Sequence, residues 1–141
     1  MAQLIADNPF RVDGDRAVLQ GSRRRSTGVV KFPAERPELF DANPDVQADI
    51  EPIDLPTEGT LFTFTSQQFP PPLPYKGHRS PEVFRPYIVG FIQLGDRVLV
   101  ESLIIGADAA ELRIGQPMVS CTTTFETESG ESLLTYAFRP A

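Results

Sequence analysis

Residues 87–105 read YIVGFIQLGDRVLVESLII, and this stretch decides the fold. Residues 87–94 are rich in β-branched and aromatic side chains, which favour a strand. Gly95-Asp96 follows, a dipeptide typical of a two-residue hairpin turn, and residues 97–105 are expected to return as an antiparallel strand. Because the returning strand is long, we expect a bend or bulge near Glu101-Ser102.

A preceding strand is predicted at residues 60–65, where the sequence alternates. Simple alternation puts Leu61, Thr63 and Thr65 on one face of this strand. It puts Phe62 on the other face, together with Phe64.

Two more strands are predicted after the hairpin, at residues 118–126 and 132–138, with a turn at Ser129-Gly130 between them. Residues 106–112 suit a turn or a single helical turn. Five strands separated by glycine corners predict an all-β protein with a five-stranded barrel, because closure removes open edges.

The N-terminal quarter predicts smaller elements. Residues 1–6 suit one helical turn or a frayed end. A short hairpin is expected around the turn pair Asp13-Gly14, and residues 29–32 form a short β-prone run that ends at Pro33.

Residues 21–39 have the outline of a small zinc ribbon that lacks its zinc ligands. Such a ribbon needs cysteines at the positions of Arg24 and Thr27, and a second pair near Glu38 and Asp41. No Cys or His occurs from residue 22 to residue 50, and structural zinc sites use thiolates or imidazoles. We therefore expect a degenerate, metal-free hairpin that is held by packing or by a partner.

The charges are unevenly distributed along the chain, whose net charge is −6. Residues 41–60 carry six acidic groups and no basic one, together with three prolines. This stretch predicts an extended linker or a solvated loop. The expected division is an N-terminal segment with the ribbon hairpin (1–40), an acidic proline-containing linker (41–58) and the barrel (59–141).

Composition limits the kinds of partner. The acidic balance argues against nucleic acid, whose binders carry a basic face. A single cysteine excludes an intramolecular disulfide. With no signal-peptide pattern and no apolar run near 18 residues, we expect a cytoplasmic protein that does not enter a membrane.

No set of residues in the sequence forms a recognisable catalytic arrangement. His78, the one histidine, lies in a polar loop where a solvated role is usual. Cys121 lies in an alternating strand and suits a buried apolar position. Glu126 and Glu128 flank a turn and resemble ordinary surface carboxylates. We therefore expect no catalytic residue, and a chain that is not an enzyme by itself.

Two basic clusters are candidate contacts for the phosphates of coenzyme A, because guanidinium and ammonium groups bind phosphate well. The first is Arg23-Arg24-Arg25 in the ribbon. The second is Lys76, Arg79 and Arg85 in the proline-rich loop. Contact with a protein partner, or plain solvated surface, is the alternative for both clusters.

The proline-rich loop, residues 69–86, is long and has no periodicity, which indicates a functional or partner-ordered segment. Its aromatic and proline side chains suit a protein interface. The candidate partner-binding residues are Phe69, Pro72, Tyr75, Phe84 and Tyr87.

The order of these parts resembles a known family. A ribbon with Thr27-Gly28 and Phe32-Pro33 precedes an acidic linker; then come the strand around Phe64-Thr65, the loop ending Pro86-Tyr87-Ile88-Val89-Gly90, and the segment Ile114-Gly115-x-Pro117-Met118. This order is similar to the acyl-CoA-associated OB-fold family with an N-terminal rubredoxin-like zinc ribbon, known as domain of unknown function 35. The resemblance covers about residues 8–140.

The resemblance implies an OB-type barrel near residues 59–140 and a ribbon near residues 18–40. It also implies a non-catalytic accessory subunit that binds a thiolase-like enzyme acting on acyl-CoA, in a hetero-oligomer whose shared interface holds coenzyme A. The chain departs from the family at the zinc ligands, so no zinc is expected. Arg24 is expected to pair with Glu38 or Asp41 in place of the metal.

Two other classes of function remain open. OB barrels often bind single-stranded nucleic acid, which needs a basic groove with stacked aromatic side chains. A free-standing enzyme would need a catalytic arrangement that the sequence does not contain.

Overall fold

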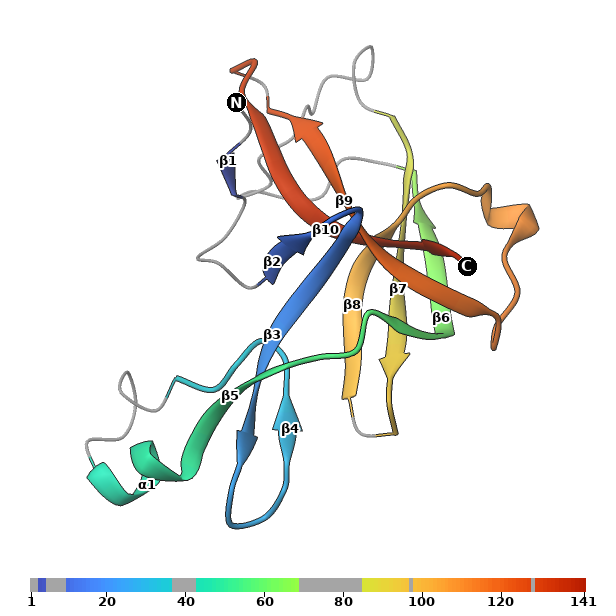
Figure 1. Cartoon of the computed structure of the whole chain (residues 1–141). Helices are drawn as coiled ribbons and strands as arrows, with labels where there is room; N and C mark the ends of the chain where they lie inside the picture. Colours follow the sequence, from blue (N-terminus) through green and yellow to red (C-terminus); the bar gives the residue numbers. More distant parts are fainter. Residues whose placement is uncertain (1–2, 5–9, 37–42, 69–84, 97, 128) are drawn as a thin grey trace.

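The computed structural model describes residues 3–4, 10–36, 43–68, 85–96, 98–127 and 129–141. Strand β6 pairs with β7, β7 with β8, β8 with β10, β10 with β9, and β9 again with β6, so the sheet closes on itself (Figure 1). The expected all-β, five-stranded barrel is confirmed. Its strands are β6 (Glu58–Gln67), β7 (Tyr87–Leu94), β8 (Val98–Ile104), β9 (Pro117–Glu126) and β10 (Ser132–Pro140).

The central hairpin β7–β8 has an unbroken register from Ile88–Ile104 to Leu94–Val98. The bulge expected near Glu101-Ser102 is therefore wrong. The hairpin turns after Leu94, which pairs with Val98, and Gly95 has the positive φ (65°) that such a turn requires.

The irregularity lies instead in β6, where the register shifts between Leu61 and Thr63. Leu61 is buried, Phe62 is exposed, and Phe64 packs against the core. The predicted grouping of Phe62 with Phe64 is therefore wrong, because the extra residue of a bulge reverses which side chains face inward.

Barrel closure depends on a close backbone approach at Gly59, on the part of β6 that pairs with β9. A Cβ atom at this position would overlap the Gln93 carbonyl oxygen and the side chain of Leu94. Glycine permits this approach because it has no side chain.

The residues before the barrel form an arm, defined as residues 10–36 and 43–55. It contains a small sheet in which β3 pairs with three strands, β2, β4 and β5 (Figure 1). The strands are β2 (Phe10–Asp13), β3 (Arg16–Arg24), β4 (Val30–Lys31) and β5 (Ile50–Asp54). The expected hairpin around Asp13-Gly14 and the short strand in residues 29–32 are confirmed.

The acidic stretch is not an extended linker where the structure describes it. Pro44–Asp49 forms helix α1, capped by the Asn43 side chain, which accepts a hydrogen bond from the Asp45 backbone N–H (2.9 Å). Ile50–Asp54 forms β5, which pairs with residues 20–24 of β3. Two acidic side chains of this stretch meet arginines of the arm: Glu51 pairs with Arg23 and Arg25, and Asp54 pairs with Arg11. Sequence position alone did not reveal these pairs.

One hydrophobic core runs from the barrel into the arm. Leu61, Ile92 and Phe138 of the barrel belong to the same buried cluster as Phe10 and Leu19 of the arm. Val30, Phe32 and Ile53, also of the arm, pack against this cluster. The arm therefore folds against the barrel, as expected for a segment too small to form its own core.

Shorter elements complete the described fold. Ala109–Glu111 forms the 3-10 turn η2, within the residues expected to make a single turn. Gln3–Leu4 forms β1, which pairs in parallel with Leu133 and Leu134 of β10. The helical turn expected at residues 1–6 is therefore wrong at residues 3 and 4, and the rest of that segment lies outside the described residues.

Replacing Gly59 with alanine should destabilise the protein by roughly 1–3 kcal/mol, because the added methyl group collides with backbone that cannot move without opening the barrel. Urea unfolding measures the change. Thr60→Ala, at the next, exposed position of β6, is the matched control and should change stability much less. Equal stability of the two variants would contradict the close approach.

Candidate functional site

The arginine cluster of the ribbon is paired with carboxylates of the arm. The Arg23 guanidinium donates to Glu51 Oε1 from Nε (2.7 Å) and also from Nη2. Arg25 Nε donates to Glu51 Oε2 at 3.3 Å. Glu51, on β5, therefore joins two of the three arginines that the sequence offered as phosphate ligands.

The third arginine of this cluster, Arg24, pairs with Glu35. Its Nε and Nη2 donate to the two carboxylate oxygens at 3.0 and 3.2 Å, and Lys31 Nζ donates to the same carboxylate at 3.2 Å. The Glu35 backbone N–H donates to the hydroxyl of Ser22, which is buried. We call Ser22, Arg24, Lys31 and Glu35 the ionic clip. It closes the ribbon between β3 and the segment that follows β4.

The ionic clip includes Arg24, one of the positions at which a zinc ribbon of the expected kind would need a ligand, and its residues do not fit that metal. Arg24, at one predicted ligand position, is a cation. Thr27, at the other, accepts a hydrogen bond from the Val29 backbone N–H (3.3 Å). Glu38 and Asp41, the expected partners of Arg24, lie outside the described residues, so this pairing stays a prediction. Among the described residues, Arg24 pairs with Glu35.

The carboxylates of the arm are stabilised in their charged form. Hydrogen bonds from Arg24 lower the pKa of Glu35 below its ordinary value of 4.5, and those from Arg23 do the same for Glu51. Arg11 likewise lowers the pKa of Asp54, which it meets at 2.6 Å. At neutral pH these groups are ionised, so the arginines of the ribbon already have anionic partners.

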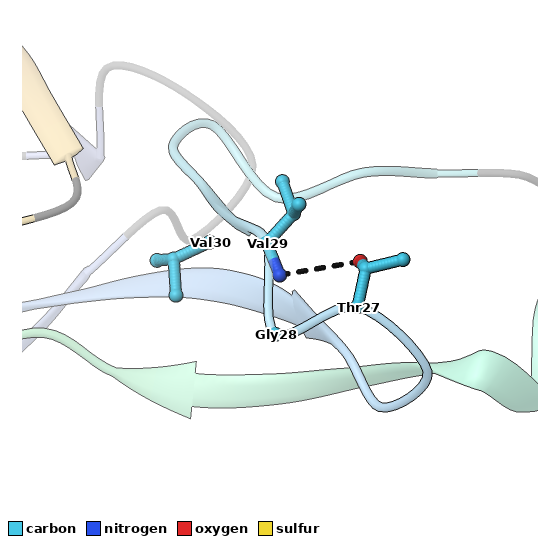
Figure 2. Close-up of a pocket in the computed structure, with 4 residues that line it drawn as sticks. All are labelled: Thr27, Gly28, Val29 and Val30. Atoms are coloured by element: carbon cyan, nitrogen blue, oxygen red, sulfur yellow. Dashed lines mark hydrogen bonds between the residues drawn. The ribbon is translucent and has the colours of Figure 1, made fainter.

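A shallow, open hollow of about 350 Å³ lies at the tip of the ribbon, lined by Thr27, Gly28, Val29 and Val30 (Figure 2). All four residues come from one short stretch of chain. Binding sites for small molecules usually enclose the ligand between several elements with converging polar groups. The described part of its lining therefore lacks the converging polar groups of a catalytic cavity.

Ser120 and Tyr136 of the barrel are two of the described side chains that contact the arm. The Ser120 hydroxyl, on β9, donates to the Ala17 carbonyl (2.6 Å) and accepts from the Ala17 backbone N–H (3.2 Å), and both residues are fully buried. Tyr136, on β10, meets the rings of Phe10 and Phe32 edge to face. The Ser120 hydroxyl thus provides β3 with the hydrogen-bond donor and acceptor that the backbone of a neighbouring strand would otherwise provide.

Tyr136 is also fixed by its hydroxyl, which donates to the Glu101 carbonyl of β8 at 3.1 Å. Burial raises the pKa of Tyr136 to about 12. The side chain is therefore neutral at physiological pH and has a structural role between the ribbon and the barrel.

Most of the expected partner-binding residues lie outside the described part of the chain. These are Phe69, Pro72, Tyr75 and Phe84, and the same holds for Lys76 and Arg79 of the second basic cluster. Tyr87 is described at the start of β7, where it is half-buried, and Arg85 is exposed just before it. The roles of all these residues stay predictions.

Of the residues considered for catalysis, Cys121 is buried on β9, and burial raises the pKa of its thiol. A thiol in this state is a poor nucleophile. His78 and Glu128 lie outside the described residues. Within the described ranges, no group of three or more His, Cys, Asp or Glu side chains could hold a metal ion. In the same ranges, every helix is too short or too polar to cross a bilayer.

Sequence reasoning missed the residues that organise the site. Glu35 and Glu51 are single acids among many in the sequence, and no local pattern assigns them to the arginines. Ser120 and Tyr136 occupy ordinary strand positions. The sequence did contain one signal: an acidic stretch at residues 41–58 follows the arginines at residues 23–25. This suggests that acids and arginines form ion pairs, but it does not show which acid meets which arginine.

Comparisons with known proteins agree on the barrel. The family model of the ChsH2 C-terminal OB-fold domain matches residues 52–123. A solved structure described as an Ltp2-ChsH2(DUF35) aldolase superposes with a TM-score of 0.55 and 20% sequence identity, over 89% of this chain and 84% of that chain. At this identity the likeness shows a common fold. The sequence matched none of the curated proteins.

Replacing Ser120 with alanine should destabilise the protein by roughly 2–4 kcal/mol, because the buried N–H and C=O of Ala17 both lose their partner. Urea unfolding measures the loss. Ser132→Ala, at an exposed position of β10, is the control and should have little effect. A Ser120 variant as stable as this control would show that the hydroxyl does not hold the arm.

A chelator should leave the thermal unfolding midpoint of the protein unchanged, because ion pairs rather than a metal hold the ribbon. Glu35→Gln should lower this midpoint by about 1–4 °C at neutral pH. The substitution removes the negative charge to which Arg24 and Lys31 both donate hydrogen bonds. Glu131→Gln, at an exposed turn of the barrel, is the control for loss of one charge. A midpoint that falls when a chelator is added would indicate a bound metal.

The effect of Glu35→Gln should also depend on pH. Because the folded-state pKa of Glu35 lies below 4.5, its ion pairs contribute fully above that value. Their contribution is lost as the pH falls through the lowered folded-state pKa. The difference in midpoint between wild type and variant should therefore shrink as the pH falls below 4.5. A difference that persists in stronger acid would contradict the ion-pair origin.

Proposed function

Because this chain belongs to the family of the ChsH2 C-terminal OB-fold domain, we propose that it is a non-catalytic accessory subunit of an enzyme that processes acyl-CoA. The family match over residues 52–123 is the observation that carries the proposal. The accessory role is supported by the surroundings of Cys121, whose buried thiol is poorly suited to nucleophilic chemistry.

The partner proposed is a thiolase-like acyltransferase, or a thiolase-like enzyme that forms or cleaves carbon–carbon bonds. The order of the ribbon, the proline-rich loop and the barrel supports this choice by resemblance to the family. The similar solved structure is described as an aldolase, a class of enzyme that acts on carbon–carbon bonds. The subunit would bind and complete the larger enzyme as part of a hetero-oligomer.

The geometry of the ribbon bears on the proposed contact with coenzyme A. A phosphate that reached Arg23 or Arg25 would have to share these side chains with Glu51, which already accepts hydrogen bonds from both. Arg25 is the more exposed of the two, and its bond to Glu51 is the longer one. We therefore favour Arg25 as the phosphate contact within this cluster. A coenzyme A site at the shared interface and the absence of zinc remain predictions.

The alternative function, binding of single-stranded nucleic acid, is not favoured by the barrel surface. In OB folds the second and third strands commonly carry the nucleic-acid face, and these correspond to β7 and β8. The exposed positions described there include Phe91, Gln93, Leu99 and Glu101, none of them basic. An acidic group on this face would repel phosphate.

Affinity purification of the tagged chain from its own cells tests the proposal. A thiolase-fold polypeptide should co-purify, be identified by mass spectrometry, and re-form a complex from the two purified proteins in size-exclusion chromatography. The isolated chain should not turn over an acyl-CoA thioester. Turnover by the chain alone, or the absence of any thiolase-fold protein among its partners, would contradict the proposal.

A further inference from the structure

The outward face of the β6–β7–β8 sheet carries an exposed apolar patch, which we call the outer patch: Phe62, Phe91 and Leu99. Their exposed fractions are 46, 40 and 43%. Each comes from a different strand of the barrel, and the three strands lie side by side (Figure 1). Adjacent exposed aromatic and aliphatic side chains on a rigid sheet are typical of an interaction surface.

Strand register makes the outer patch continuous. Phe91 lies opposite Thr63, the residue that follows Phe62 in the bulge of β6. On its other side Phe91 lies opposite Glu101, two residues along β8 from Leu99. Diagonal neighbours on one face of a sheet are within reach of aromatic and long side chains. The bulge thus places Phe62 on the same outward face of the sheet as Phe91.

A single carboxylate, that of Glu101, stands within this apolar surface. Among the residues that the structure describes, no ion pair or hydrogen bond involves this carboxylate; the contact with Tyr136 uses the backbone carbonyl. By contrast, Glu35, Glu51 and Asp54 of the arm are all paired with arginines. Glu101 is therefore available to a cation from outside the chain.

The charge of the outer patch argues against a second copy of this chain as its occupant. Apposing two copies through this face would place the two Glu101 carboxylates near each other, and each chain carries a net charge of −6. Like charges brought together in an interface are strongly unfavourable. A different protein with an apolar surface that carries an arginine or lysine would pack against the phenylalanines and form an ion pair with the Glu101 carboxylate.

From these observations we infer that the outer patch receives the larger enzyme subunit, through an apolar surface of that subunit that bears a basic side chain opposite Glu101. The inference rests on the proposed accessory function and names the surface that performs it. Stable interfaces bury roughly 800 Å² on each partner. The outer patch is therefore the centre of the contact, and neighbouring residues of β7 and β8 form its polar rim.

The test is a binding titration of the purified chain with the thiolase-fold subunit recovered by affinity purification. The double variant Phe91→Ser/Leu99→Ser should weaken binding by about tenfold or more. Glu101→Arg should weaken it comparably through repulsion of the partner's cation, and Glu101→Gln should weaken it less. Ile114→Ser is the matched control, since Ile114 is an apolar side chain 69% exposed outside the patch, and its affinity should stay within about twofold of wild type.

The outcomes separate the two proposals. If wild type binds the subunit and the patch variants bind equally well, the inference is overturned while the accessory function stands. If wild type binds no thiolase-fold subunit, the accessory function fails and the inference with it. Dimerisation of the isolated chain in analytical ultracentrifugation that the patch variants abolish would assign the surface to a second copy. Binding of single-stranded DNA that these variants abolish would assign it to nucleic acid. Either result would overturn the inference.

Discussion

Strand β9 determines the whole architecture, because it pairs with β6 and β10 to close the barrel and holds β3 through the hydroxyl of Ser120. A barrel strand usually has hydrogen-bonding neighbours only along its two edges. Here a side chain provides a further donor and acceptor for a backbone that would otherwise be buried without partners. Ala17 lies directly above this point, and the arm continues from it as one extended strand to Arg24. The position of the ribbon relative to the barrel follows from this anchor and from the contact of Tyr136 with Phe32.

The ribbon shows how a small β-element can be held by ion pairs instead of by the metal that a zinc ribbon needs. A metal site binds its ligands in a fixed geometry, whereas exposed ion pairs are weak one by one. This ribbon compensates in two ways. It arranges the charges as networks, with Glu51 between two arginines and Glu35 between Arg24 and Lys31. Its Val30 and Phe32, together with Ile53 of β5, also pack against the core of the barrel. The arginines that suggested a phosphate site thus have a structural role in the arm.

The distribution of charge divides the surface into two regions with different properties. In the arm, acids and bases largely neutralise one another. On the outward face of β7 and β8, the Glu101 carboxylate stands among exposed apolar side chains. Such a surface suits a protein partner better than a polyanion. It is consistent with an accessory subunit of the family to which the chain belongs, whose contribution is a shaped contact surface on a rigid barrel.

The sequence by itself determined the five strands of the barrel and the class of fold. Alternation in residues 60–65 and 118–126, and the run around Gly95-Asp96, were sufficient to predict the strands, because side-chain periodicity and turn residues are local properties. The order of the motifs also identified the family. The tertiary structure decided what depends on contacts distant in sequence: that Phe62 faces outward across a bulge, that residues 50–54 pair with β3, and that Arg24 meets Glu35. Several acids were available to each arginine, and the sequence does not encode which one the returning chain brings within hydrogen-bonding distance.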